Sequence, residues 1–155
     1  MAVETERKFL VSGDAWRNLG TPIEYTQGYL ARGNGVTVRI RISGDKAFFT
    51  VKGPVSGISR AEFEYPVPVN DAREMLGLCK DPVIEKTRTR IPHASHVWEV
   101  DEFGGKNSGL IIAEVELAHP DDVVVLPPWV GNEVTGDPRY YNSNLAIHPF
   151  MDWLS

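Results

Sequence analysis

Short stretches of alternating hydrophobic and polar residues make up most of the first 118 residues of the chain. They are rich in β-branched and aromatic residues and end at glycine, proline or asparagine turns, which is typical of β-strands. The pattern predicts eight strands, over residues 3–11, 25–32, 36–43, 46–53, 59–67, 83–91, 96–103 and 109–118. Because short turns join most of them, we expect an antiparallel meander or barrel.

Helical periodicity is rarer along the chain. The segment 70–79 starts at Asn70 and brings Leu76 and Cys79 to one face, which predicts a helix. Further helices are predicted over 13–19, 120–126 and 143–154. We therefore expect a mainly β (α+β) protein.

Composition limits the kind of protein. The 155 residues are 42% hydrophobic and 24% charged, which fits one compact globular domain. Sixteen Lys and Arg against 21 Asp and Glu give a net charge of −5, which disfavours nucleic-acid and anionic-membrane surfaces as partners. Cys79 is the single cysteine, so no internal disulfide is expected and a reducing cytoplasm is favoured. The apolar run Val123–Leu126 is too short to cross a membrane.

Charged residues recur at every second position of most predicted strands, so they share one face of each strand. Arg39 and Arg41, for example, flank Ile40, which points to the other side. The acidic residues in these rows are Glu4, Glu6, Glu62, Glu64, Glu99, Asp101, Glu114 and Glu116, and the basic ones are Lys8, Arg39, Arg41, Lys52, Arg60, Lys86, Arg88 and Arg90. Strand parity alone leaves open whether this face is solvated or points into a barrel.

Two features favour a binding role for the charged face. It is dominated by Glu and Arg rather than by mixed polar residues, and three strands carry pairs of glutamates two residues apart, such as Glu4 and Glu6. Like charges at that spacing repel, and a hard divalent cation such as Mg²⁺ or Mn²⁺ would offset the repulsion. Arg and Lys side chains suit a phosphate chain that binds such a metal.

The chain opens with Glu4-x-Glu6-x-Lys8, which resembles the ExExK signature of the CYTH superfamily, the triphosphate tunnel metalloenzymes. The motifs that follow match in order: Gln27-Gly28-Tyr29-Leu30, Arg39-x-Arg41, Thr50-Val51-Lys52-Gly53, Arg60-x-Glu62-x-Glu64, Glu85-Lys86-Thr87-Arg88, Glu99-x-Asp101 and Glu114-x-Glu116. Glu133 to Asn142 resembles the closing segment of the short bacterial members, so the resemblance covers roughly residues 2–147.

The resemblance implies a closed, eight-stranded antiparallel barrel that forms a tunnel, with helices packed outside and the charged face inside. Residues 1–147 would form this tunnel domain. A tail, 148–155, follows it and contains Phe150, Met151, Trp153 and Leu154. Both a plug at the tunnel mouth and a subunit contact are open for this tail.

The resemblance also implies an activity, the metal-dependent hydrolysis of inorganic tripolyphosphate to pyrophosphate and phosphate. The substrate would be a small phosphate chain, and a homodimer is possible. The alternatives within enzymes are a class IV-type adenylyl cyclase and a thiamine or nucleoside triphosphatase. The alternative outside enzymes is a polyphosphate-binding sensor.

Roles for individual residues follow from the same resemblance. The metal, Mg²⁺ or Mn²⁺, would be held by Glu4, Glu6, Glu114 and Glu116, while Asp101 would support either a metal or an arginine. The phosphate path would be lined by Lys8, Arg39, Arg41, Lys52, Arg60, Lys86 and Arg88. Glu62 and Glu64 would hold a second metal or orient the attacking water, and Lys8 and Lys86 would act in catalysis. Tyr29 would favour inorganic triphosphate as substrate.

Overall fold

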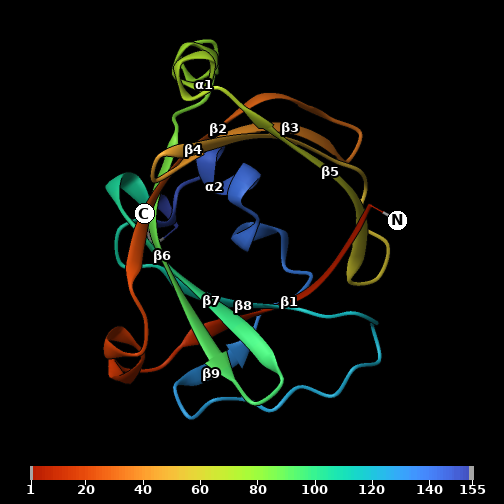
Figure 1. The fold of residues 1–155 in the computed structure, drawn as a ribbon, viewed down its shortest axis with the longest axis vertical. Helices are drawn as coiled ribbons and strands as arrows, with labels where there is room; N and C mark the ends of the chain where they lie inside the picture. The colour runs from red at the N-terminus through yellow and green to blue at the C-terminus, as the bar shows by residue number, and fades with distance from the viewer. Residues whose placement is uncertain (1, 154–155) are drawn as a thin grey trace.

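The main element of the computed structural model, which describes residues 2–153, is a ring of eight antiparallel strands (Figure 1). The strands are β1 (Val3–Val11), β2 (Pro22–Gly33), β3 (Val36–Ser43), β4 (Lys46–Lys52), β5 (Ser59–Val67), β6 (Ile84–His93), β7 (His96–Phe103) and β8 (Ile111–Glu116). They pair in the order β5-β4-β3-β2-β6-β7-β8-β1, and β1 pairs again with β5, so the ring closes. Each of the eight predicted strands is confirmed, four of them with the predicted ends (β1, β3, β5 and β7) and four with shifted ends.

A ninth strand, β9 (Val130–Glu133), pairs with the end of β1 at Phe9 and Val11. The hydrophobic pattern does not predict it because only Val130 of its four residues is apolar. A bidentate bond from the Arg7 guanidinium to the Glu133 carboxylate, at 2.9 and 2.8 Å, also joins the two strands.

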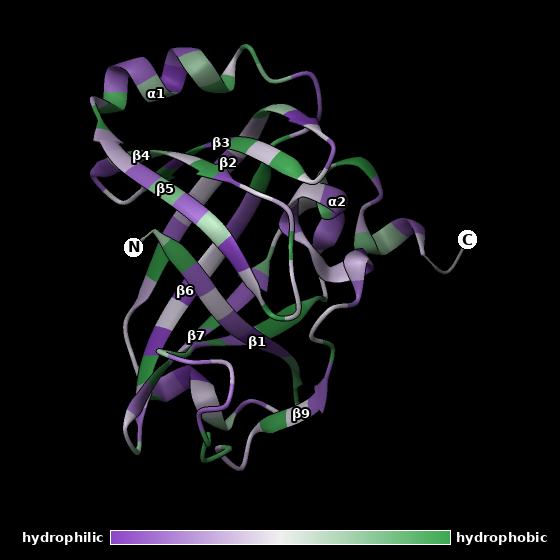
Figure 2. Ribbon diagram, turned by 90° about the vertical axis from the view of Figure 1, so that its right-hand side faces the viewer, coloured by the Kyte–Doolittle hydropathy of each residue, from purple (hydrophilic) through white to green (hydrophobic). Residues whose placement is uncertain are grey.

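Many hydrophobic side chains of the strands face outward from the ring, and two clusters of them are buried there, whereas Phe63 and Tyr65 of β5 stay exposed. Figure 2 shows hydrophobic and hydrophilic residues alternating along the strands. On one side Trp98 of β7 is fully buried in a cluster with Phe9 and Trp16. Trp16 lies in the short helix η1 (Ala15–Asn18). On another side α1 (Val69–Leu76) packs Ala72 against Ile40, above β2 to β4 in Figure 1. The charged rows are left to face the interior.

The prediction that the helices pack outside the ring holds for α1 but not for α2 (Asn142–Ile147), which lies within the outline of the ring in Figure 1. Leu145 of α2 is fully buried against Ile112 and Phe103. Those two residues lie on the inner face, because Ile112 is two positions from Glu114 and Phe103 is two positions from Asp101. Apolar packing of α2 therefore fills one end of the ring.

The tail continues this packing. Phe150, in η4 (Phe150–Asp152), and Trp153 contact each other and Tyr140 of η3 (Pro138–Tyr140) beside α2. The backbone N–H of Phe150 donates to Asn107 Oδ1 at 2.8 Å, and Asn107 lies in η2 (Gly105–Asn107). Residues 148–153 thus pack behind the helix that fills the ring, whereas Leu154 lies outside the described residues.

Three of the predicted helices need correction. Residues 120–126 form a turn and irregular chain, because the Asp122 carboxylate accepts from the N–H groups of Ala118 and His119 and so holds a tight turn. The segment 143–154 is broken at His148, which precedes a proline and has a non-helical backbone, φ −133° and ψ 77°. Only a 3₁₀ turn forms within 13–19. The helix 70–79 is confirmed in its first part.

None of the helices within residues 2–153 is both long and apolar enough to cross a membrane.

Candidate active site

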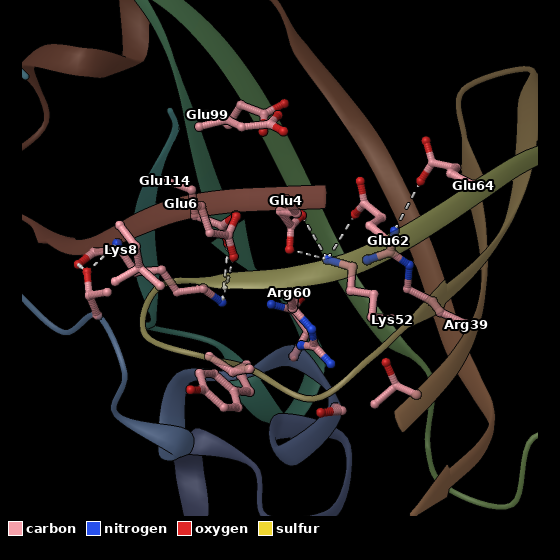
Figure 3. A pocket seen from close by; sticks show the side chains of 18 of the residues that line it. Glu4, Glu6, Lys8, Arg39, Lys52, Arg60, Glu62, Glu64, Glu99 and Glu114 are labelled. Carbon is pink, nitrogen blue, oxygen red and sulfur yellow. Dashed lines mark hydrogen bonds and ion pairs between the residues drawn. The ribbon is translucent and has the colours of Figure 1, made fainter. Parts of the chain in front are cut away.

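A cavity of about 220 Å³ lies inside the ring, and we call it the tunnel (Figure 3). The charged inner rows of the strands form its wall, and the segment from Thr135 to Ser143 lines it at one end. The predicted site residues that line it are Glu4, Glu6, Lys8, Tyr29, Arg39, Arg41, Lys52, Arg60, Glu62, Glu64, Lys86, Arg88, Glu114 and Glu116. The structure therefore brings together all of the predicted site residues except Asp101 around one cavity.

Strand β1 carries Glu4, Glu6 and Lys8 in one inward row, because residues two apart share a face. On the neighbouring strand β8, Glu114 is the cross-strand partner of Lys8, and Glu116 is the partner of Glu6. The Lys8 ammonium lies 3.6 Å from the Glu114 carboxylate and 3.9 Å from that of Glu6. Four carboxylates of β1 and β8 thus line the tunnel, and two of them lie beside Lys8.

A second lysine joins this group from β4, on the other side of β5. Lys52 of β4 places its Nζ 3.0 Å from both carboxylate oxygens of Glu4. It also lies 3.3 Å from a carboxylate oxygen of Glu62, its partner on β5 (Figure 3). The carboxylates of β1 and β5 are therefore bridged by an ammonium group.

The acidic group still carries more negative charge than its lysines neutralise. Burial raises the pKa of Glu6 well above its ordinary value, and the nearby charges of Glu114 and Glu4 raise it further. Burial likewise raises the pKa of Glu116, with the charge of Glu4 adding to it. The pKa of Lys8 lies above its ordinary value. Burial lowers this pKa, but the charges of Glu114 and Glu6 raise it by more. An added cation would relieve this repulsion.

The donor set fits a hard divalent metal in kind, since Mg²⁺ and Mn²⁺ bind carboxylate oxygens. As the side chains of residues 2–153 lie, however, no group of three or more acidic, histidine or cysteine residues is arranged to hold a metal ion. Lys52 and Lys8 lie close to the carboxylates of Glu4, Glu6 and Glu114. These ammonium groups occupy the carboxylate oxygens that a metal ion would bind. Metal binding would therefore require the ammonium groups to move away, toward an anionic ligand.

Asp101 lies on the inner face of β7 but does not line the tunnel. It is fully buried, and its two oxygens accept from the Arg88 guanidinium at 2.7 and 2.8 Å. The Lys86 ammonium lies 2.8 Å from the same carboxylate. Burial raises the pKa of Asp101, but Arg88 and Lys86 lower it to below its ordinary value. Of the two roles predicted for Asp101, these ion pairs favour support of the basic residues.

The basic side of the tunnel is crowded with cations. The guanidinium groups of Arg41 and Arg88 lie 5.0 and 4.9 Å from the centre of the Tyr25 ring. Burial lowers the pKa of Lys86 to about 7, an effect that Asp101 opposes and that the charges of Arg88 and Arg41 increase. Arg39 Nε is buried and has no hydrogen-bond partner within residues 2–153. A buried donor without an acceptor is costly, so this side of the tunnel is suited to an anion.

The remaining predicted residues take positions along the wall. Arg60 donates to the backbone carbonyls of Gly53, at 2.9 Å, and Gly35, at 3.3 Å. Glu64 is 40% exposed and accepts from Arg39 at 3.4 Å. Tyr29 is buried at the end of the tunnel filled by α2.

The sequence patterns missed two amide residues at the site. Gln27 is fully buried between Arg41 and Asn142, and Asn142 lines the tunnel from the start of α2. Both side chains are uncharged, so the alternation of charged residues does not identify them. Both do occur in the motifs quoted above for the resemblance, which is the one signal that pointed to them.

Residues 2–141 match the CYTH domain family. The chain is similar to an inorganic triphosphatase of Acetivibrio thermocellus, with 49% identity over 154 residues that span 99% of each chain. It is also similar to an inorganic triphosphatase of Nitrosomonas europaea, with 35% identity over 93% of this chain and 97% of that one.

The fold agrees with these sequence relationships. A crystal structure of an inorganic triphosphatase superimposes with a TM-score of 0.68 and 31% identity, over 92% of this chain and 97% of that chain. The match of the family to most of the chain, the two full-length relatives and the shared fold lead to one conclusion: this protein belongs to the CYTH domain family.

Proposed function

We propose that this protein hydrolyses inorganic tripolyphosphate to pyrophosphate and phosphate inside the tunnel, with the help of a divalent metal ion. The single observation that supports this most is the tunnel wall, where carboxylates of β1 and β8 face a crowded basic side that includes Arg39, Arg41 and Lys86. A short, linear, metal-binding polyanion complements both sides at once. Two full-length relatives bear the name inorganic triphosphatase, which supports the same substrate.

The reaction needs one bond exchange at the terminal phosphorus. The oxygen of a water molecule forms a bond to that phosphorus, the bond to the bridging oxygen breaks, and pyrophosphate leaves with the electron pair. The proton of the water passes to solvent or to a carboxylate such as Glu62, whose pKa burial and the charge of Glu4 raise. Phosphoryl transfer depends mainly on positioning and electrostatic stabilisation.

The basic residues would provide that stabilisation. Arg39, Arg41 and Arg88 would bind the phosphate oxygens, and the free Nε donor of Arg39 would find its acceptor there. Lys8, Lys52 and Lys86 would neutralise the remaining negative charge of the phosphate chain. Arg60 would line the phosphate path at the tunnel wall. When the substrate draws Lys52 away from Glu4, the carboxylates of β1 are freed to bind a cation.

The metal would be held by Glu4, Glu6, Glu114 and Glu116. Mg²⁺ or Mn²⁺, when bound, would supply charge neutralisation at the phosphate oxygens. Glu62 and Glu64 would orient the water or hold a second ion.

Phosphate release from tripolyphosphate, ATP and thiamine triphosphate, each with Mg²⁺ or Mn²⁺, tests the proposal. We expect the highest kcat/KM for tripolyphosphate, because α2 fills one end of the ring and leaves a cavity of about 220 Å³. A higher value for ATP or thiamine triphosphate, or formation of a cyclic nucleotide, would replace it with one of the other enzyme functions. Tight binding of tripolyphosphate without hydrolysis in any metal would indicate a sensor.

A cytoplasmic location and a homodimer belong to the same proposal. The first is supported by the single cysteine, Cys79. The second remains a prediction that analytical ultracentrifugation can test.

A further inference from the structure

Asn142 is the first residue of α2, and its side chain contacts the basic side of the tunnel. Its Oδ1 accepts from the Lys86 ammonium at 2.9 Å and from Gln27 Nε2 at 3.1 Å. Two donors from two different strands, β6 and β2, therefore converge on a single amide oxygen. An amide flipped by 180° would place its NH₂ group against both donors, so these contacts select one orientation.

Lys86 depends on this contact for its direction. An ammonium group has three N–H donors, and within residues 2–153 it finds an acceptor in Asp101 at 2.8 Å and a second in Asn142. Its side chain is only 1% exposed. With two donors fixed from either side, the third is left for a ligand in the tunnel.

The same amide oxygen connects to a second cation through Gln27. The Oε1 of Gln27 accepts from Arg41 Nε at 2.9 Å, while its Nε2 donates to Asn142. Gln27 is fully buried, so neither bond is exchanged with solvent. One continuous hydrogen-bonded chain thus runs from Arg41 through Gln27 and Asn142 to Lys86.

Asn142 is held at this place by the rest of α2. Leu145 is fully buried in the apolar end of the ring, and Asn144 Nδ2 donates to the carbonyl of Pro138 at 2.7 Å. Arg32 of β2 adds hydrogen bonds to the backbone carbonyl of Ser143 and to Asn144 Oδ1. The docking of the helix therefore fixes the position of the amide.

We propose that Asn142 is a positioning residue that orients Lys86 directly and Arg41 through Gln27, so that the docked α2 completes the basic side of the tunnel. The proposal rests on the proposed function, since it assigns these two cations to the phosphate path. It extends the site to a residue one position beyond the segment that matches the CYTH domain family, residues 2–141.

Three substitutions on α2 test the role of the amide oxygen. Asn142→Ala removes the acceptor and should lower kcat/KM for tripolyphosphate by up to about 100-fold, the cost of a catalytic group misplaced by about 1 Å. Asn142→Asp retains an acceptor for both donors and should recover most of the activity. Ile147→Ala is the matched control, because it truncates an exposed side chain at the far end of the same helix and should leave kcat/KM within about twofold. Asn142→Ser, too short to reach Lys86, replaces the alanine variant if that variant fails to fold.

A double-mutant cycle shows whether Asn142 acts through Lys86. In a Lys86→Met background, Asn142→Ala should lower kcat/KM by less than about tenfold, because the cation that it orients directly is gone and only the path through Gln27 to Arg41 remains. An equal loss in both backgrounds, or wild-type activity in Asn142→Ala, would overturn the proposal. If the wild-type protein does not hydrolyse tripolyphosphate, the proposed function fails instead. The affinity of the same variants for tripolyphosphate, measured by calorimetry in chelator, then tests the role of Asn142. Asn142→Ala should weaken binding, Asn142→Asp should restore it, and the loss should be smaller in the Lys86→Met background.

Discussion

Glu6 on β1 and Glu116 on β8 are direct cross-strand partners, so two carboxylates extend from neighbouring strands into the same part of the tunnel. Like charges in this position destabilise a sheet. The fold accepts this cost at the place where the proposed function needs a cation, which suggests that part of the stability of the free protein is given up for binding.

Replacement of Glu6 by Gln should therefore stabilise the metal-free protein. Burial, with the charges of Glu114 and Glu4, holds the pKa of Glu6 in the folded protein well above the ordinary value of 4.5. In the pH window between these two pKa values the folded state binds more protons than the unfolded state. Stability of the wild type must then fall as the pH rises through the window. Glu6→Gln does not titrate, and its advantage should grow above pH 4.5 to about 1 kcal/mol.

Thermal unfolding in chelator at several pH values measures this difference. Glu133→Gln is a control of opposite sign. The hydrogen bond from Arg7 lowers the pKa of Glu133, so its ionised form stabilises the folded protein above pH 4.5, and the substitution should cost stability there. A Glu6→Gln variant less stable than the wild type at pH 8 would contradict the repulsion described here.

Removal of divalent metal should stop the hydrolysis of tripolyphosphate. We expect no phosphate release after EDTA treatment and recovery on addition of Mg²⁺ or Mn²⁺. Either ion should also raise the Tm of the wild type, as a ligand of the folded state does. Glu4→Ala should lose both effects and stay folded, whereas Glu133→Gln should keep them. Unchanged phosphate release in EDTA would show that the metal is not required.

Strand parity predicted the inner wall of the tunnel well, because a period of two is fixed by the backbone itself. Arg39 and Arg41 face the same side whatever surrounds them, and Ile40 between them faces the other side, so the alternation itself identifies the charged face. The same parity placed Asp101 with the site residues, although it is fully buried behind Arg88 and Lys86. Which charged residue of a row reaches the cavity depends on its cross-strand partners, and these depend on the closure of the ring.

The position of α2 could not be predicted from its own sequence. Leu145 and Ala146 form an apolar pair that would suit the outer face of the ring as well as its interior. What decides the matter is the inner row of Ile112 and Phe103, which leaves one end of the ring apolar. Tyr29 of β2 and Ile84 of β6 belong to the same apolar cluster, and they come together only when these two strands, distant in sequence, pair. The tunnel contacts of Asn142 follow from the same long-range arrangement.

Arg39→Ala tests the basic side of the tunnel. The Nε of Arg39 is buried without a partner within residues 2–153, and its Nη2 lies 3.4 Å from Glu64, so the guanidinium is available to an anionic ligand. We expect a loss of about 2–4 kcal/mol of transition-state stabilisation, as for other single electrostatic donors. Steady-state kinetics with tripolyphosphate measures it. Arg73→Ala on α1, an exposed cation remote from the tunnel, should leave the kinetics unchanged, and equal kinetics for both variants would place Arg39 outside the phosphate path.

Asp101→Asn separates the two roles predicted for Asp101. If the carboxylate supports Arg88 and Lys86, its loss leaves both buried cations without their shared counter-charge, and the metal-free protein should lose about 3–5 kcal/mol of stability. If Asp101 served only as a metal ligand, the metal-free protein would be unaffected, and only the rise of Tm with Mn²⁺ would disappear. Urea unfolding in chelator measures the first result, and thermal unfolding with and without excess Mn²⁺ measures the second. Glu102→Gln, on the same strand but pairing at the surface with Arg17, is the control and should cost less than about 1 kcal/mol.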